Sequence, residues 1–370
     1  MYFYKNKDFL VNLRSKMKRN IILLAALVAA FAVSCKEPGP QPRPTIPLVL
    51  SIASDTSYVG KVAQGAGHEG PRGHIALFGE RKGGILLARR FQSADRVDNI
   101  DGSAKRDSLL DFAGETIDVI MDAYNEPYTR FSSSQSGLDS LREAAVRGAM
   151  FAWDSLSKAK IVIFTSSIHA SNGLFDVDTL QQIAGGVSYL MTPVHESLKA
   201  ASERGAKDIA VWASAQVRDA KVYEKVFEEL GLEGSVTTLT PPSALDICTE
   251  FRSLLREYRP NGKKMDALIL DKLGMDPAPL WAEIPLIRRG STEEDDAFNA
   301  MLPESFFILD PVECVVEATY NLLRKENLFS HRIHRPAVKY FITEESLEGG
   351  LQLQPLSAQY VQSEYVPYIN

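Results

Sequence analysis

Polar side chains follow several short apolar runs of this chain that have the composition of β-strands. Thr165, Ser166 and Ser167 follow one such run, Ser214 follows a second and Lys272 ends a third. Hydroxyl and backbone N–H groups can hold a carboxylate, but a hydroxyl does not ionise near neutral pH. A lysine acts as a base only if burial lowers its pKa by several units from roughly 10.4. These residue types are therefore better suited to binding than to proton transfer.

The apolar runs and the amphipathic stretches between them predict the elements that position these side chains. Strands are expected at Ile75–Phe78, Ile117–Met121, Ile161–Phe164, Val187–Leu190, Ile209–Ala213, Ala267–Asp271 and Phe306–Leu309, and helices at Leu138–Leu156, Pro193–Arg204, Asp219–Leu230, Ala244–Tyr258 and Pro311–Lys325. Apolar strands that alternate with helices form parallel sheets covered on both faces, so the predicted class is α/β. In such sheets the ligand site lies beyond the carboxyl ends of the strands, where the strand order reverses.

The composition excludes several partners. The net charge is -6 and no basic stripe with interleaved aromatic residues occurs, so we expect no nucleic acid partner. The histidines are scattered, and His331 with His334 has no carboxylate or cysteine cluster nearby, so we expect no metal and no other cofactor. Cys248 and Cys314 could pair outside the cytosol, but such cysteines are more often buried as small apolar side chains.

The N-terminal segment has the order of a bacterial lipoprotein signal. Basic residues precede the apolar run Ile21–Val33, which ends just before Ser34 and Cys35. A run of about 13 residues is too short to span a bilayer, which takes roughly 20. We expect residues 1–34 to be a signal peptide and Cys35 to be lipidated. The alternative is a buried apolar element followed by a chance cysteine.

The segment after the cysteine indicates where the protein is held. Residues 35–50 combine the lipidated cysteine with a proline-rich stretch that acts as a semi-rigid spacer. Lys36-Glu37 resembles a surface-export signal of Bacteroidota lipoproteins, and this resemblance favours the outer membrane or the cell surface. We therefore expect a protein of the bacterial cell envelope whose contact with the membrane is a lipid anchor.

Six segments also resemble, in order, the motifs of one family. They are GHIALFGERKGG at 73–84, DAYNEPY at 122–128, KIVIFTSS at 160–167, IAVWASAQV at 209–217 followed by Tyr223-Glu224, MDALILDK at 265–272, and LDPVE at 309–313 with VKYFIT at 338–343. Together they resemble the glutamate racemases, and we expect a fold of the Asp/Glu racemase superfamily. That resemblance implies two doubly wound parallel-sheet domains with a ligand cleft between them.

The resemblance fails at the two residues that perform the family's chemistry. The two cysteines of the family map onto Thr165 and Lys272. Racemisation removes a proton from one face of a carbon and returns one to the other, which requires a matched pair of acid–base groups. A threonine hydroxyl and a lysine ammonium are not such a pair. Two-sided racemisation is therefore not expected, while one-sided chemistry such as decarboxylation, elimination or enolisation stays open.

Candidate ligand contacts lie around these two positions: Glu80, Asp122, Tyr128, Ser166, Ser167, His169 and Ser214. Each also has a structural interpretation. The Thr165–Ser167 segment could serve only as a helix cap. His169 could be a packed or surface residue, Glu80 a solvated turn residue, and Asp122 with Tyr128 structural loop residues. Lys272 could form an ion pair with the adjacent Asp271 that closes the vacant site.

The resemblance implies a discontinuous domain arrangement. The first domain comprises residues 51–190 with 300–350, the second is the insertion 191–299, and 351–370 is a tail. Residues 51–72, rich in Gly and Ser, could form a flap or a mobile loop, and the acidic stretch at 291–303 is expected to be a charged loop.

Three functions remain open at this stage. The first is a lipid-anchored protein that binds a small carboxylate or amino-acid-like ligand without racemising it. The second is an enzyme with altered, one-sided proton chemistry, in which Lys272 is desolvated, faces Thr165 and is assisted by His169 or Glu80. The third is a structural or interaction lipoprotein whose cleft is packed and holds no donors. We also consider a homodimer.

Overall fold

The computed structural model describes residues 44–65, 69–131, 135–154, 158–186, 188–272, 274–330, 332, 334–347 and 349–364. The predicted signal peptide, Cys35 and the spacer up to residue 43 lie outside these residues. The described residues from Thr45 onward form one compact unit. Among the described helices, none is long and apolar enough to cross a membrane.

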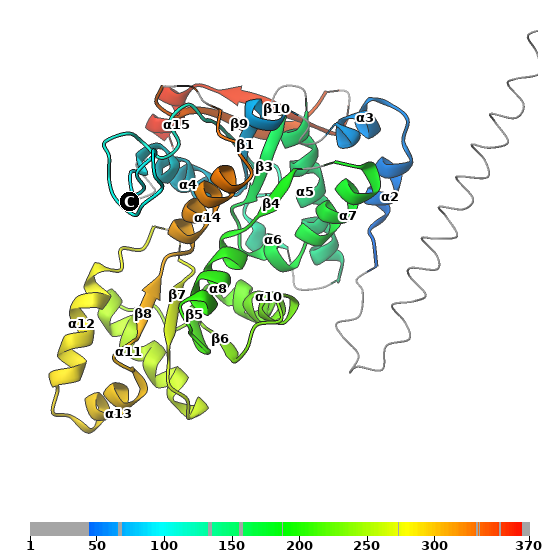
Figure 1. Cartoon of the computed structure of the whole chain (residues 1–370). Helices are drawn as coiled ribbons and strands as arrows, with labels where there is room; N and C mark the ends of the chain where they lie inside the picture. Colours follow the sequence, from blue (N-terminus) through cyan, green and yellow to red (C-terminus); the bar gives the residue numbers. More distant parts are fainter. Residues whose placement is uncertain are drawn as a thin grey trace, which may run out of the picture. The chain divides into compact units, whose positions relative to one another are not determined.

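The first sheet has six strands in the order β10-β9-β2-β1-β3-β4 (Figure 1). Their bounds are β1 His74–Gly79, β2 Thr116–Met121, β3 Ala159–Phe164, β4 Tyr189–Met191, β9 Ala337–Glu345 and β10 Leu351–Leu356. Neighbouring strands are parallel except for β9 and β10. The chain moves from β1 to β2 on one side and then to β3 on the other, so the strand order reverses between β1 and β3.

The second sheet has four parallel strands in the order β6-β5-β7-β8. Their bounds are β5 Asp208–Trp212, β6 Ser235–Leu239, β7 Ala267–Leu270 and β8 Phe307–Leu309. The chain again moves from the first of these strands to one side and returns on the other. The order therefore reverses between β5 and β7, and the sheet repeats the winding of the first.

Helices connect the strands. Their bounds are α2 Pro47–Ser54, α3 Tyr58–Gln64, α4 Arg81–Ser93, α5 Gln135–Trp153, α6 Ile168–Ser171, α7 Leu174–Ala184, α8 Pro193–Glu203, α9 Ala215–Asp219, α10 Val222–Glu229, α11 Ile247–Tyr258, α12 Ala278–Arg289, α13 Glu293–Met301, α14 Pro311–Lys325 and α15 Ala358–Glu364. Several begin at a side chain that caps the first turn, among them Thr192, Asp246 and Asp310. Such caps bind backbone N–H groups that have no partner within the helix.

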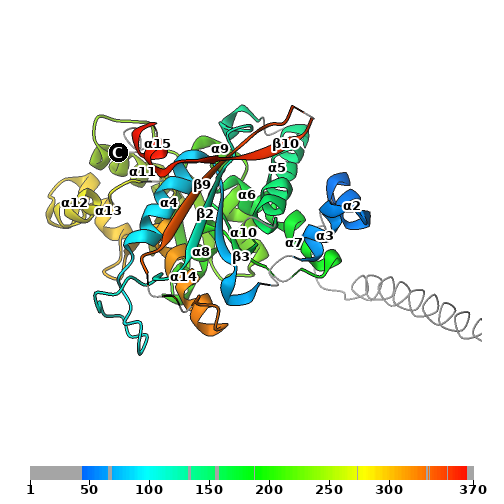
Figure 2. The ribbon, with the colours of Figure 1, turned by 90° about the horizontal axis from the view of Figure 1, so that it is seen from above.

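The first sheet is covered on both faces because its central strands are apolar on both sides. Ile75 and Leu77 belong to a core with α4 and α14, whereas Ala76 and Phe78 belong to a core with α5 and α7. Figure 2 shows α4 and α5 on opposite sides of these strands. Successive residues of a strand point to opposite faces, so the run Ile75–Phe78 supplies both cores. The predicted α/β class with parallel sheets is confirmed.

One further core joins the two sheets. It contains Ile168 of α6, Val194 of α8, Val211 of β5, Tyr223 of α10 and Cys314 of α14. Because these side chains come from elements of both sheets, the carboxyl ends of β3 and β7 are held in a fixed relation.

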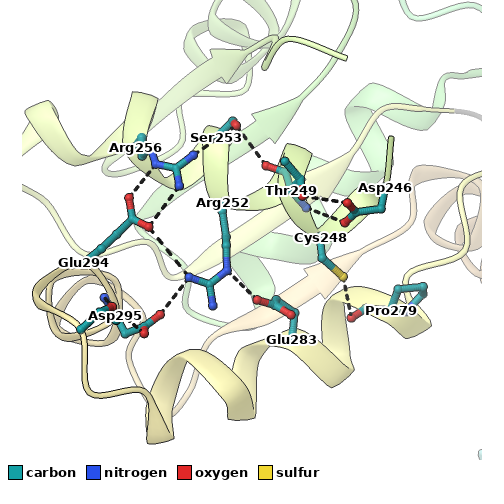
Figure 3. A network of polar contacts seen from close by, with 11 residues as sticks. Asp246, Cys248, Thr249, Arg252, Ser253, Arg256, Pro279, Glu283, Glu294 and Asp295 are labelled. Atoms are coloured by element: carbon teal, nitrogen blue, oxygen red, sulfur yellow. Dashed lines mark hydrogen bonds and ion pairs between the residues drawn. The ribbon is translucent and has the colours of Figure 1, made fainter. Parts of the chain in front are cut away.

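The outer side of the second sheet is held by an ionic network (Figure 3). Arg252 of α11 donates to Glu283 of α12 at 2.7 Å and to Asp295 of α13 at 2.9 Å. Arg256, one turn further along α11, binds Glu294 of α13. The guanidinium groups thus tie α12 and α13 to α11, the helix that follows β6.

Two segments expected to be loops are helical. Residues 51–72 contain the last turn of α2 and all of α3, and Ile52 and Ala63 are buried. Residues 291–303 contain α13, whose N-cap Thr292 and acidic first turn favour a helix start. The many acidic residues there indicate a helix N-terminus, with Phe298 on the buried face.

The expected boundaries also need two corrections. The boundary at residue 300 assigns β8 to the first domain, but β8 pairs with β7 in the second sheet. Residues 351–370 were expected to be a tail, yet β10 pairs with β9 in an antiparallel hairpin and α15 follows it. The alternation Leu351, Leu353 along β10 is the pattern of a half-buried strand. Val187, the expected start of β4, lies outside the described residues.

Candidate functional site

A cavity of about 690 Å³ lies beyond the carboxyl ends of strands from both sheets. Its lining residues are Glu80, Lys82, Gly83, Glu126, Thr129, Thr165, Ser166, Ser167, Ile168, Ser214, Gln216, Val217, Asp271, Lys272, Gly274 and Met275. Glu80 follows β1 and Thr165 follows β3, the two strands between which the order of the first sheet reverses. Ser214 and Asp271 follow β5 and β7, the equivalent pair of the second sheet. Ligands of open α/β sheets bind at these reversals, so the cavity has the location that the strand pattern predicts.

Thr165 is held against the first sheet. Its side chain is buried, its backbone N–H donates to the Phe78 carbonyl at 2.8 Å, and its Oγ1 donates to the same oxygen at 3.3 Å. The approach is so close that a Cβ atom on Gly79 would lie 2.4 Å from Thr165 Oγ1. The Thr165 hydroxyl therefore binds the scaffold through the Phe78 carbonyl.

Lys272 also forms an ion pair, but its partner differs from the one that the sequence suggested. Its Nζ forms an ion pair with Glu250 of α11 at 2.7 Å and lies 4.6 Å from the centre of the Trp212 ring. The pair with Asp271 that the sequence suggested does not form, because the ammonium reaches α11. One third of the Lys272 side chain is exposed to solvent.

Asp271, which sequence analysis passed over as a ligand contact, is the most unusual acid in the cavity. Its Oδ1 accepts a hydrogen bond from Ser167 Oγ at 2.7 Å. Burial raises the pKa of the Asp271 carboxyl to about 7, and the bond from Ser167 opposes that rise. The sequence offered one signal: an acidic residue at the end of a short apolar run.

Glu80 is not the solvated turn residue that was one interpretation. It lines the cavity, and its Oε1 accepts from the Tyr128 backbone N–H at 2.9 Å. Burial raises the pKa of the Glu80 carboxyl, with smaller contributions from the nearby charges of Glu126 and Asp122. Glu126 is itself in contact with Arg81 at the start of α4.

Asp122 and Tyr128 lie outside the cavity lining and stabilise the loop after β2. The Asp122 carboxylate accepts from the Tyr128 hydroxyl at 2.9 Å, from Asn125 Nδ2 at 3.0 Å and from Thr343 Oγ1 at 3.0 Å. Both side chains are buried. Their role is structural: they fix the loop whose Tyr128 backbone N–H binds Glu80.

His169 is a core residue and not a ligand contact. Its ring lies 4.9 Å from that of Tyr128, 5.8 Å from that of Phe164 and 5.9 Å from that of Phe78. Burial lowers the pKa of the imidazole to about 4. The ring is therefore neutral at pH 7 and does not line the cavity.

The buried His169 gives a pH dependence with a definite sign. An unfolded histidine has a pKa near 6.5, so between pH 6.5 and pH 4 the folded state binds fewer protons than the unfolded state. Its contribution to stability is complete above pH 6.5 and is lost as the pH falls through about 4. The loss amounts to roughly 3 kcal/mol. In urea titrations at pH 7 and pH 4, His169→Phe should lose less stability than the unsubstituted protein by about this amount.

His195 supplies an internal comparison for that experiment. Burial lowers its pKa to about 4 as well, and the substitution leaves it in place. Both proteins should therefore lose some stability on acidification, and only the difference between them reports on His169. An identical pH dependence of the two proteins would contradict the buried, neutral imidazole.

The remaining hydroxyl groups line the cavity as expected. Ser166 and Ser167 follow β3 directly, and Ser214 is the N-cap of the short helix α9, where it accepts from the Val217 N–H. Gln216 binds the Tyr128 carbonyl with its Nε2 at 2.9 Å. The cap interpretation and the ligand interpretation are therefore compatible for Ser214, because a capping side chain also faces the cavity.

Neither remaining cysteine lines the cavity. Cys248 Sγ lies 3.7 Å from the Pro279 carbonyl oxygen (Figure 3), and Cys314 is buried in the core on α14. Both are free thiols. Within the described residues no cluster of His, Cys, Asp or Glu could hold a metal ion.

Comparisons with known proteins give results only at the level of structure. No family model matches the chain, and no curated protein matches it. Solved structures similar to it include glutamate racemases from Bacillus anthracis (16% identity, TM-score 0.49, covering 74% of this chain and 90% of that one), Francisella tularensis in complex with D-glutamate (17%, 0.45, 75% and 91%) and Aquifex pyrophilus (16%, 0.45, 74% and 90%). All three are glutamate racemases, the proteins whose motifs the sequence resembles.

Proposed function

We propose that this chain binds a small carboxylate or amino-acid-like ligand in the cavity and does not racemise it. One observation carries the proposal. The cavity of about 690 Å³ has a mixed lining that includes several hydroxyl and charged side chains, while the two cysteine positions of the resembled family hold side chains that are bound elsewhere in the protein. Without a matched acid and base on two faces of a carbon atom, two-sided proton transfer has no means to proceed.

The lining groups suit a ligand that carries both a negative carboxylate and a positive ammonium group. Lys82 in the first turn of α4 and the Ser166 hydroxyl can bind a carboxylate, and the Ser214 hydroxyl adds a further polar contact. Glu80, whose one oxygen binds the Tyr128 N–H, can accept from an ammonium group with the other. A ligand with one carboxylate and one amine would therefore have a partner for each charge.

Thermal-shift measurements on the mature domain test this proposal. The probes are D- and L-amino acids and dicarboxylates. A ligand at 100 times its Kd should stabilise the folded state by about 2.7 kcal/mol. Ser166→Phe fills part of the cavity and should abolish the effect, while Ser51→Phe on the exposed surface of α2 should retain it. The proposal fails if no probe stabilises the protein, or if Ser166→Phe is stabilised equally.

The alternative function is an enzyme that uses Lys272 as the base for one-sided proton transfer. The ion pair between Lys272 and Glu250 does not favour this alternative. We expect Lys272→Met to fold, with a free energy of unfolding lower by about 1 kcal/mol, because a partly exposed ion pair and cation–π contact contribute little. Ligand stabilisation should persist in this variant. Complete loss of α-proton exchange in Lys272→Met, with binding retained, would instead establish Lys272 as the base. A purely structural lipoprotein would require a packed, donor-free cleft, and a cavity whose lining includes Lys82, Ser166 and Ser214 does not favour it.

We further propose that the protein is anchored in the bacterial cell envelope through Cys35. The basic, apolar and small-residue sections that precede this cysteine support the proposal, and the proline-rich segment to residue 50 would separate the folded unit from the membrane. Expression in a bacterium with a labelled fatty acid should label the protein. Cys35→Ser should remain unlabelled, and label retained in that variant would contradict the anchor.

A further inference from the structure

We propose that Asp271 is the acid–base group of this cavity and that it exchanges the α-proton of a bound carboxylic acid from one face only. The inference rests on the proposed function, since it needs the ligand to occupy the same cavity. It differs from the Lys272 alternative because it assigns the chemistry to a carboxyl group at the end of β7.

The position of Asp271 is the first observation. It follows β7 at the strand-order reversal of the second sheet, and its Oδ1 accepts from Ser167, which follows β3 of the first sheet. That 2.7 Å bond fixes the carboxyl group between the two sheets. Among the described residues, no protein group donates a hydrogen bond to Oδ2. The second oxygen of a fixed carboxyl group in a cavity is a site for proton transfer.

The charge around Asp271 is the second observation. In the described part of the chain no Lys or Arg forms an ion pair with it, and its neighbour Lys272 is bound to Glu250. Tyr223 of α10 lies close by, and its side chain is fully buried. Burial and the Asp271 charge both raise the pKa of that phenol well above 10, so Tyr223 stays protonated. The cavity also contains Glu80, whose pKa is raised by burial.

These surroundings leave the carboxyl group able to take and return a proton near neutral pH. The pKa of about 7 means that both of its forms are populated there. An acid–base group works best when its pKa is near the operating pH. An ordinary aspartate, ionised almost completely at pH 7, would hold a transferred proton too weakly to return it efficiently.

The proposed step is balanced without an added reactant. Asp271 Oδ2 takes the α-proton, and the electron pair of the broken C–H bond enters the ligand's carboxylate to form an enediolate. Lys82 and Ser166 line the cavity as groups that can stabilise the added negative charge. The protonated Asp271 exchanges with solvent and returns a deuteron to the same face. Thr165 cannot serve the opposite face, since its hydroxyl donates to the Phe78 carbonyl. Configuration is therefore retained.

The test follows the α-proton signal of D- and L-amino acids by NMR in deuterated water, together with chiral analysis of the recovered ligand. We expect the signal to disappear in the presence of the protein while the configuration stays unchanged. Asp271→Asn keeps the size of the side chain and should slow the exchange at least ~100-fold. Asp276→Asn, an exposed position that also precedes α12, should leave it unchanged. Thermal shifts with the same probes report binding separately.

The pH profile distinguishes a direct role from a structural one. The base form of Asp271 is the active one, so the exchange rate should rise as the pH passes through about 7 and level off above it. The Ser167 bond lowers the pKa of Asp271, so Ser167→Ala should move the midpoint to higher pH. A substitution that merely loosened the fold would reduce the rate without moving the midpoint.

The outcomes separate the two proposals. Probes that stabilise the protein without exchange overturn the role of Asp271 and leave the binding function standing. Exchange that persists in Asp271→Asn, or that racemises the ligand, also overturns this inference. Absence of stabilisation by every probe overturns the proposed function and, with it, the acid–base role.

Discussion

Lys160→Met should lower the free energy of unfolding by about 3–5 kcal/mol, because it removes one partner of a buried ion pair. Lys160 Nζ lies 2.7 Å from Glu115 Oε2, and both side chains are at most 2% exposed. The ammonium also donates to the carbonyls of Leu328 at 2.7 Å and Pro71 at 3.2 Å. The substitution leaves a carboxylate without its counter-charge in a site that excludes water. Urea titration at pH 7 measures the loss.

The double variant Lys160→Met with Glu115→Gln is the matched control. The amide oxygen of Gln can still accept from the Ser330 N–H, which Glu115 Oε1 binds at 2.8 Å. With both charges gone, part of the lost stability should return, because removing a buried pair costs less than removing one member. A double variant less stable than Lys160→Met would contradict the argument. This pair holds the amino ends of β2 and β3, so we expect little effect on the cavity at their other ends.

Gly79→Ala should destabilise the protein by about 2–5 kcal/mol, through backbone strain and overpacking together. Gly79 ends β1 with a φ of 152°, a conformation that residues with a side chain rarely adopt. Its new Cβ would lie 2.4 Å from Thr165 Oγ1, and this hydroxyl cannot move freely because it is buried against the Phe78 carbonyl. The substitution therefore displaces the segment that carries Ser166 and Ser167. We expect weaker ligand binding as well as a lower Tm.

Two variants separate strain from contact in that prediction. Gly185→Ala has a φ of 76° with nothing within 4 Å of the added Cβ, so it measures strain alone and should cost about 1 kcal/mol. Gly79→Ala with Thr165→Ala removes the clashing oxygen and should be more stable than the sum of the two single effects predicts. Simple additivity would show that Thr165 does not press against the end of β1.

Much of this fold follows from local pattern. The apolar runs at Ile75–Phe78 and Ile161–Phe164 form strands because residues on both of their faces are buried. The amphipathic stretch at Pro311–Lys325 forms α14 with one buried face. One strand of lower contrast escaped the same reasoning: β6 is only partly buried, and its side chains show little of the periodicity by which strands are predicted.

The sequence predicted where the cavity lies, but it predicted only some of the residues that line it. Glu80, Ser166, Ser167 and Ser214 meet at one cavity because strands end there, and a strand end is visible in a sequence. His169 and Asp122 come from segments beside the same strand ends, yet the winding of the chain buries them. A side chain that follows a strand can lie in a cavity or in a core, depending on how the helix after the strand packs. The spacing of residues in the sequence does not predict this packing.

The sequence by itself determined the α/β class and the strand ends where polar residues gather, because these depend on residue type and on short-range periodicity. Only the tertiary structure decided which charges meet. Lys272 forms an ion pair with Glu250 and not with its neighbour Asp271. Asp271 instead accepts a hydrogen bond from Ser167, which is far away in the chain. The interaction between two charges that are many residues apart depends on the distance that folding sets between them. It also depends on how much water packing removes from around them. For this reason the raised pKa of Asp271 could be recognised only in the folded structure and not in the sequence.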